Sequence, residues 1–193
     1  MSNSHSPSAL PNRLIRRFTA VAVGLLLLWF FGYERTLAID GRLDKLLCSN
    51  IATSAAAVLR VVGFNAQAGR MQPQMLFMGE HAAVWVGPGC NGLVLYALFA
   101  GFVLAYPGRL SRKAWYIPAG MVLIYGLNVL RVAVLALNHE YYPRSLDFNH
   151  HYTFTTIVYA CIFGLWMLWA QWLAPLSPAA VWGAETIKKS HHL

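Results

Sequence analysis

Long apolar runs alternate with short polar segments along this chain of 193 residues. A run of about 20 apolar residues is long enough to cross a bilayer as a helix. Four runs approach that length, at residues 14–33, 91–106, 115–137 and 153–173, and the second is the shortest. The pattern therefore predicts an all-α integral membrane protein, a helical bundle of about four transmembrane spans.

Residues 43–62 have a different pattern, because apolar and polar side chains fall on opposite helical faces. The apolar stripe comprises Leu43, Leu46, Leu47, Ile51, Val58, Leu59 and Val62, and the polar face comprises Asp44, Lys45, Ser49, Asn50, Thr53 and Arg60. This pattern is typical of a helix that lies in the membrane interface. A crossing helix is the alternative, but it would put the basic amino terminus outside the cell, and basic segments favour the cytoplasm. Charge therefore favours four spans plus one interfacial helix.

Residues 75–86 (MLFMGEHAAVWV) contain two β-prone runs on either side of Gly79-Glu80. They predict a small extracytoplasmic β-hairpin, with a structured loop as the alternative. The hairpin delivers the chain to residues 87–90 at the outer face. The predicted organisation is a cytoplasmic basic tail at 1–13, a membrane domain at 14–175 and a cytoplasmic carboxy-terminal tail at 176–193.

Composition agrees with a membrane protein. The chain is 58% hydrophobic and 11% charged, which excludes an ordinary soluble domain. Its net charge of +8 is explained by Lys and Arg in cytoplasmic segments, such as Arg109, Arg112 and Lys113, so no nucleic-acid partner is predicted. The cysteines, Cys48, Cys90 and Cys161, match no zinc or redox spacing.

Arg131 is a charged residue inside the third predicted span. A charge at membrane depth costs several kcal/mol, so it usually has a function and a partner. Asn128 lies three residues earlier and therefore on the same helical face. A functional role is favoured for Arg131, whereas an interhelical hydrogen bond is an equally good interpretation of Asn128.

Cys90 lies where a nucleophile would be activated. Pro88-Gly89 ends the hairpin and Cys90-Asn91 opens the second span, where the positive end of a helix dipole favours a thiolate. Glycines at 87, 89 and 92 leave room for a substrate backbone. A structural cysteine in a glycine-rich turn is the alternative.

His150 and His151 directly precede the last span, at the same outer end as Cys90 and Arg131. One histidine would take the thiol proton and return it to a leaving amine, while Arg131 stabilises the thiolate or the developing oxyanion. Adjacent helical residues point about 100° apart, so only one histidine should face Cys90. A Cys48–Cys90 disulfide is conceivable outside the cytoplasm and would silence the nucleophile.

The segments Gly89-Cys90-Asn91-Gly92-Leu93, Asn128-Val129-Leu130-Arg131 and His150-His151 together resemble the exosortase/archaeosortase family. That family combines a cysteine in a C-x-G-L turn, an N-x-x-R helix and a later histidine in a multi-pass membrane protein. The resemblance covers residues 70–165 and identifies the chain as similar to a compact bacterial member. In the family the histidine is often followed by an acidic residue, whereas here a second histidine follows; aromatic positions downstream slightly favour His150.

The resemblance implies a cysteine protease/transpeptidase in the bacterial inner membrane, with its active site on the extracytoplasmic side. It implies Cys90, Arg131 and His150 or His151 as catalytic residues, with Asn128, Gly89, Asn91 and Gly92 in support. The implied substrates are exported proteins with a carboxy-terminal sorting signal, namely a short motif, a membrane helix and a basic cluster. The implied acceptor is a cell-surface glycan or lipid, and the chemistry needs no cofactor.

Two other functions are alternatives. A non-catalytic transport or polysaccharide-assembly subunit would use Arg131 as a structural counter-ion. A metalloprotein would use Cys90 with some of the histidines, but no pair of them has the helical i, i+4 spacing of a zinc protease.

Overall fold

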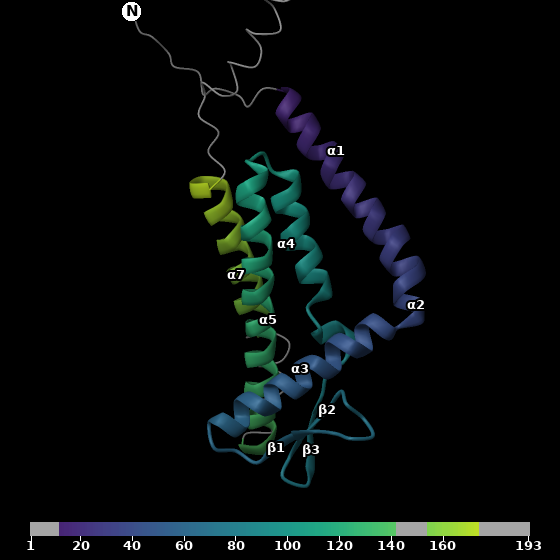
Figure 1. Cartoon of the computed structure of the whole chain (residues 1–193), viewed down its shortest axis with the longest axis vertical. Helices are drawn as coiled ribbons and strands as arrows, with labels where there is room; N and C mark the ends of the chain where they lie inside the picture. The colour runs from purple at the N-terminus through teal and green to yellow at the C-terminus, as the bar shows by residue number, and fades with distance from the viewer. Residues whose placement is uncertain (1–11, 142–153, 174–193) are drawn as a thin grey trace, which may run out of the picture.

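The computed structural model describes residues 12–141 and 154–173. Helix α1 (Asn12–Leu28) continues through a π-helical segment (Trp29–Leu37) into the short helix α2 (Ala38–Asp40). Gly41 then adopts φ 64°, a left-handed conformation that glycine reaches without strain, and the chain turns into α3 (Arg42–Val61). Figure 1 shows that α3 runs obliquely across one end of the bundle formed by α4 (Leu93–Ala105), α5 (Leu110–Tyr141) and α7 (Phe154–Leu168).

Three helical segments are long and apolar enough to cross a membrane: Arg16–Arg35, Leu110–Tyr141 and Phe154–Leu173. They correspond to the first, third and fourth spans predicted from the sequence. The second predicted span is the shorter apolar helix α4, whose 13 residues rise about 20 Å, less than the hydrocarbon thickness of about 30 Å. The turn before α4 therefore lies within the depth of a membrane rather than above it.

A small antiparallel sheet lies at the α3 end of the bundle (Figure 1). The predicted hairpin is confirmed as β2 (Met75–Met78) and β3 (His81–Trp85), joined through Gly79 at φ 60°. The sheet also contains β1 (Ala66–Ala68), which pairs with β2 and extends the predicted two-stranded hairpin to three strands. The sequence Ala-Gln-Ala carries no strand signal of its own, so β1 depends on its pairing with β2.

Helix α3 is not one of the candidate spans, in agreement with the predicted interfacial helix. Its buried face differs from the predicted apolar stripe, because small side chains let α3 approach α5 and the sheet closely. That face consists of Asp44, Cys48, Ile51, Ala52, Ala55, Ala56 and Leu59. Most of the larger stripe residues are exposed instead, including Leu46, Val58 and Val62. One face of α3 therefore packs on protein, and the apolar side chains that project elsewhere suit a membrane surface.

The core consists of two clusters that meet along α5. One cluster joins α3 and the sheet to the second half of α5, around Ile51, Leu76 and Val132. The other joins α4 and α7 to the first half of α5, around Phe99, Ile124 and Trp169. The turn that begins α4 lies where the two clusters meet.

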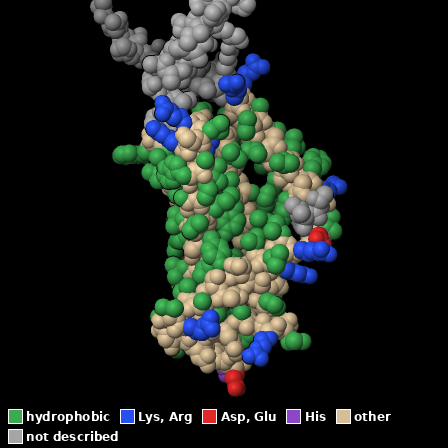
Figure 2. Space-filling model, viewed as in Figure 1, with side chains coloured by type: hydrophobic (Ala, Val, Ile, Leu, Met, Phe, Trp, Pro, Cys, Tyr) green, Lys and Arg blue, Asp and Glu red, His purple; other side chains and the backbone are tan. Residues whose placement is uncertain are grey.

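Basic side chains lie at several places on this face, including the end of the bundle opposite the sheet (Figure 2). Two of them, at the start of α5, also close the carboxyl ends of neighbouring helices. The Arg112 guanidinium donates to the Leu173 carbonyl and the Lys113 ammonium to the Leu104 carbonyl, each at 2.7 Å. Residues interpreted only as topology signals thus neutralise the negative ends of two helix dipoles.

Candidate functional site

One part of the expected site is the Cys90 turn, a name used here for residues 87–92. Pro88–Cys90 forms one turn of 3₁₀ helix, closed by a hydrogen bond of 2.8 Å from the Cys90 amide to the Gly87 carbonyl. Gly92 follows at φ 75° and α4 begins at Leu93. The predicted break of the hairpin at Pro88-Gly89 is therefore present, but the helix begins at Leu93 rather than at Cys90-Asn91, and Cys90 lies in the 3₁₀ turn before it.

Asn91 is the internal brace of the Cys90 turn. Its side chain is only 2% exposed, and its Oδ1 accepts a hydrogen bond of 2.9 Å from the Leu93 amide. That bond satisfies one of the amides that the first turn of a helix leaves without an intrahelical partner. The Asn91 Nδ2 donates in the opposite direction, to the Asp44 carboxylate of α3.

Asp44 is a polar residue of this site that sequence reasoning missed. It is 5% exposed, and it also accepts a hydrogen bond of 2.9 Å from the Tyr33 hydroxyl. The sequence pattern places it on the polar face of an interfacial helix and gives it no role in the site. The signal that could have found it is the spacing of Asp44, Cys48, Ala52 and Ala55, which places the carboxylate on the small-residue face of α3.

Asn128 approaches the Cys90 turn from α5. Its side chain is 1% exposed, and its Nδ2 donates to the Ile124 carbonyl at 3.2 Å. A Cβ atom at Gly92 would collide with the Asn128 amide, so the two backbones approach closely because residue 92 has no side chain. Arg131 lies three residues further along α5 and is half-buried.

A cavity of about 260 Å³, which we call the Arg131 cavity, separates these elements. The Cys90 turn and the start of α4 form one wall, with Pro88, Gly89, Asn91, Gly92, Leu93, Val94 and Leu95. Asn128 and Arg131 of α5 and Thr155, Val158 and Tyr159 of α7 form the rest. Five of the eight residues assigned to the site from sequence thus line one cavity: Gly89, Asn91, Gly92, Asn128 and Arg131.

Cys90 itself does not line the Arg131 cavity, although both of its chain neighbours do. Its side chain is half-buried and packs against the cluster formed by α3, the sheet and α5. Cys48 belongs to that cluster, and burial raises the pKa of its thiol. Neither cysteine is part of a disulfide, so the conceivable Cys48–Cys90 bond is not formed in this structure.

His150 and His151 lie outside the described residues, so the structure does not test their predicted role. Among the described residues that line the cavity, the one nearest to them in sequence is Thr155, in the first turn of α7. Within residues 12–141 and 154–173, no three His, Cys, Asp or Glu side chains gather where they could hold a metal ion.

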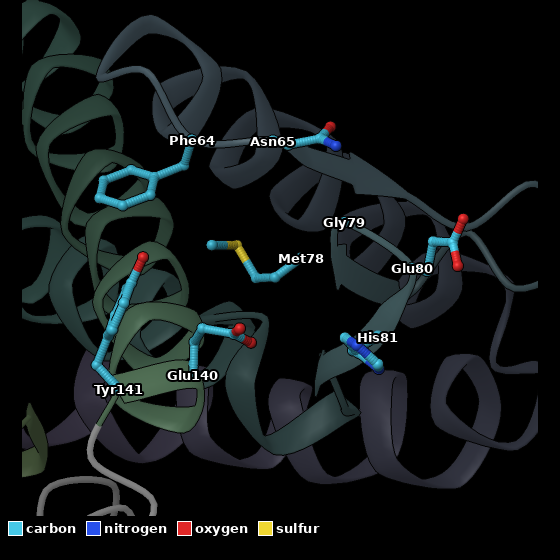
Figure 3. A pocket seen from close by; sticks show the side chains of 8 residues that line it. All are labelled: Phe64, Asn65, Met78, Gly79, Glu80, His81, Glu140 and Tyr141. Carbon is cyan, nitrogen blue, oxygen red and sulfur yellow. The ribbon is translucent and has the colours of Figure 1, made fainter.

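A second and larger pocket, of about 360 Å³, opens between the β2–β3 turn and the end of α5 (Figure 3). Phe64, Asn65, Met78, Gly79, Glu80, His81, Glu140 and Tyr141 line it. Figure 3 shows the Met78 side chain inside this pocket, with the aromatic rings of Phe64 and Tyr141 to one side, while Glu80 points away. It shares no lining residue with the Arg131 cavity and is therefore a separate feature.

Comparison with known protein families matches residues 9–169 to the family described as Transmembrane exosortase (Exosortase_EpsH). Comparisons with curated proteins and with solved structures found no match. The match to the family covers all of the described elements up to the end of α7, including both walls of the Arg131 cavity. The chain belongs to the transmembrane exosortase family.

Proposed function

We propose that this protein is a membrane-embedded cysteine protease/transpeptidase that cleaves the carboxy-terminal sorting signals of exported proteins. The observation that carries the proposal is the Arg131 cavity. In a member of the exosortase family, a glycine-rich cysteine turn faces a buried asparagine and an intramembrane arginine across a space of about 260 Å³. Buried polar groups that converge on one cavity are the usual mark of a binding or catalytic site.

In the proposed reaction, His150 or His151 takes the proton from the Cys90 thiol. The thiolate sulfur attacks the carbonyl carbon of the scissile peptide bond, and the carbonyl oxygen becomes an oxyanion. The Arg131 guanidinium stabilises that charge where little water competes with it. The intermediate then collapses to a thioester, and the histidine returns its proton to the departing amine.

The second half of the reaction releases the product. A nucleophile attacks the thioester carbonyl, the histidine takes its proton, and Cys90 leaves as a thiolate. With a cell-surface glycan or lipid as the nucleophile, the exported protein is transferred to that acceptor. With water as the nucleophile, the thioester is hydrolysed and the cleaved protein is released. Neither half requires a cofactor.

The position of the site suits a substrate that is anchored by its own membrane helix. Asn128 lies about 22 Å along α5 from Lys113, and the short α4 keeps the Cys90 turn at a similar depth. Irregular backbone is tolerated at that depth only where it is buried in protein or lines a cavity. The Cys90 turn meets that condition, and a peptide bond just outside a substrate's membrane helix would reach the same depth.

The charge pattern supports an orientation in the bacterial inner membrane. Arg112 and Lys113 lie in the first turn of α5 and Arg109 directly precedes it, and α5 begins at the same end of the bundle as α1, which contains Arg16 and Arg17 (Figure 1). Basic segments favour the cytoplasm, so the sheet, α3 and the Arg131 cavity are assigned to the extracytoplasmic side.

The deciding experiment is a processing assay in membranes. A host protein with a carboxy-terminal motif, membrane helix and basic cluster is followed by gel shift with the wild type and with Cys90→Ala, Cys90→Ser and Arg131→Ala at equal protein levels. Loss of cleavage in all three variants is expected. Normal cleavage by Cys90→Ala would remove the nucleophile and favour a non-catalytic membrane subunit with Arg131 as a structural counter-ion.

A further inference from the structure

We infer that Asp44 is a positioning residue for the Cys90 turn, acting through Asn91. The inference rests on the proposed function, in which Cys90 is the nucleophile. It gives a role in the site to α3, the helix that crosses the end of the bundle. Asp44 lies outside the three sequence segments that resemble the family.

The first step is the cost of burying Asp44. An isolated carboxylate away from water is strongly unfavourable unless hydrogen bonds compensate for its lost solvation. Asp44 is 5% exposed, and among the described residues no Lys or Arg side chain forms an ion pair with it. It lies in the first turn of α3, where the helix dipole favours a negative charge, and it accepts hydrogen bonds from Tyr33 and Asn91.

The second step is where those bonds lead. Tyr33 belongs to the end of the first membrane span, whereas Asn91 immediately follows Cys90 in the chain. The carboxylate therefore ties three segments together: the first span, α3 and the Cys90 turn. Because it accepts from the Asn91 Nδ2, it also fixes which end of the amide faces Leu93, leaving Oδ1 to accept from the Leu93 amide.

The third step is the consequence for Cys90. The Cys90 turn is held from the α3 side by the hydrogen bond of Asn91 to Asp44, and from the α5 side by the close approach of Gly92 to Asn128. Without the carboxylate, Asn91 loses an acceptor in a buried place and is free to rotate away from Leu93. The thiol would then be displaced relative to the Arg131 cavity, and a displacement of about 1 Å can lower a rate about 10²-fold.

The test uses the full chain in detergent or membranes. Asp44→Leu removes both acceptor oxygens, and Asp40→Leu is the matched control because Asp40 is an exposed carboxylate four residues earlier. Hydrogen exchange is measured on the peptide covering residues 87–93, with a peptide from the middle of α5 as the internal reference. Processing is measured at equal protein levels, with kcat and KM separated.

For Asp44→Leu, faster exchange is expected in residues 87–93 but not in α5. Processing should fall about 10²-fold in kcat, with KM little changed. For Asp40→Leu, both quantities should stay at wild-type values. Unchanged exchange in residues 87–93 of Asp44→Leu would overturn the inference.

A charge swap separates positioning from mere burial. Asn91→Asp alone sets two carboxylates against each other and should slow processing. The double variant D44N/N91D restores one carboxylate and one amide, because an amide at 44 donates to a carboxylate at 91 that still accepts from Leu93. Recovery relative to Asn91→Asp is expected. If processing did not recover in the double variant, the inference would be contradicted. It would also be contradicted if Tyr33→Phe lost as much processing as Asp44→Leu, since the carboxylate would then act through the first span.

The exchange measurement needs no substrate, which keeps the two proposals distinguishable. If Cys90→Ala processes normally, the proposed function fails whatever the exchange rates are. If Cys90→Ala is inactive but Asp44→Leu leaves exchange and kcat unchanged, only the positioning role of Asp44 fails.

Discussion

Replacing Gly92 with alanine tests how the Cys90 turn is held against α5. Gly92 has φ 75°, and a left-handed conformation costs an L-residue about 1–2 kcal/mol. The new Cβ would also collide with the Asn128 amide, and relieving such overpacking costs about 1–3 kcal/mol. Gly92→Ala should therefore destabilise the protein by about 2–5 kcal/mol, which is a fall of roughly 4–20 °C in melting temperature for a chain of this length.

The matched control is Gly89→Ala, three residues earlier on the same turn. No atom lies within 4 Å of a Cβ built at Gly89, and its φ is not positive. Its stability should stay within about 0.5 kcal/mol of the wild type. Thermal unfolding in detergent, followed by tryptophan fluorescence, gives the comparison. Gly89→Ala should nevertheless slow processing, because Gly89 lines the Arg131 cavity where a substrate backbone would approach.

A double variant divides the cost at Gly92 into its two parts. Adding Asn128→Ala to Gly92→Ala removes the collision but not the left-handed backbone, so about 1–3 kcal/mol should return and about 1–2 kcal/mol should remain lost. Equal melting temperatures for Gly92→Ala and the wild type would refute the close packing of α4 on α5 at this point. The proposed reaction would then lose its geometric basis.

Three further predictions concern Arg131, Lys113 and the buried thiol of Cys48. Arg131→Gln should lower single-turnover cleavage about 10²–10³-fold, with a smaller loss in Arg131→Lys; full activity of Arg131→Gln would remove the electrostatic role. Lys113→Met should lower the free energy of unfolding by about 1–2 kcal/mol, because the Leu104 carbonyl at the end of α4 loses a charged donor. Arg109 is exposed, so Arg109→Met should leave the free energy of unfolding unchanged in the same thermal measurement. Burial raises the folded-state pKa of the Cys48 thiol above its ordinary 9.0. The stability that this group contributes is therefore present below pH 9 and is lost as the pH rises further. Between pH 9 and 10, the melting temperature of Cys48→Ala should fall less than that of the wild type.

The membrane helices and the hairpin were predictable because their signals are local. Apolar length identifies the spans, and two β-prone runs around Gly79 identify β2 and β3. The grouping of Gly89, Gly92, Asn128 and Arg131 around one cavity was also predictable. The Cys90 turn begins a short apolar helix and Asn128 and Arg131 lie midway along a longer one, so the spans place them at similar depths.

Asp44 and the buried face of α3 were not predictable in the same way. The helical spacing of Leu, Ile and Val predicts the apolar stripe of α3, but in the fold the small residues of this helix face α5 and the sheet. Which face of an amphipathic helix packs on protein depends on how closely its neighbours approach, and that is a tertiary property. Once Cys48, Ala52 and Ala55 define the packed face, Asp44 must be buried with them, and its partners can come only from segments that the sequence separates widely.

The position of the Cys90 turn between the two core clusters explains why so few side chains control it. The cluster around Phe99 fixes α4 against α5 and α7, and the cluster around Ile51 fixes α3 against the far half of α5. The turn itself contributes no large side chain to either cluster; Cys90 only packs partly against one of them. Its geometry therefore depends on specific contacts, namely Asn91 with Asp44 on one side and Gly92 with Asn128 on the other. Loosening either contact should therefore displace the Cys90 turn, so both Asp44→Leu and Gly92→Ala should slow processing.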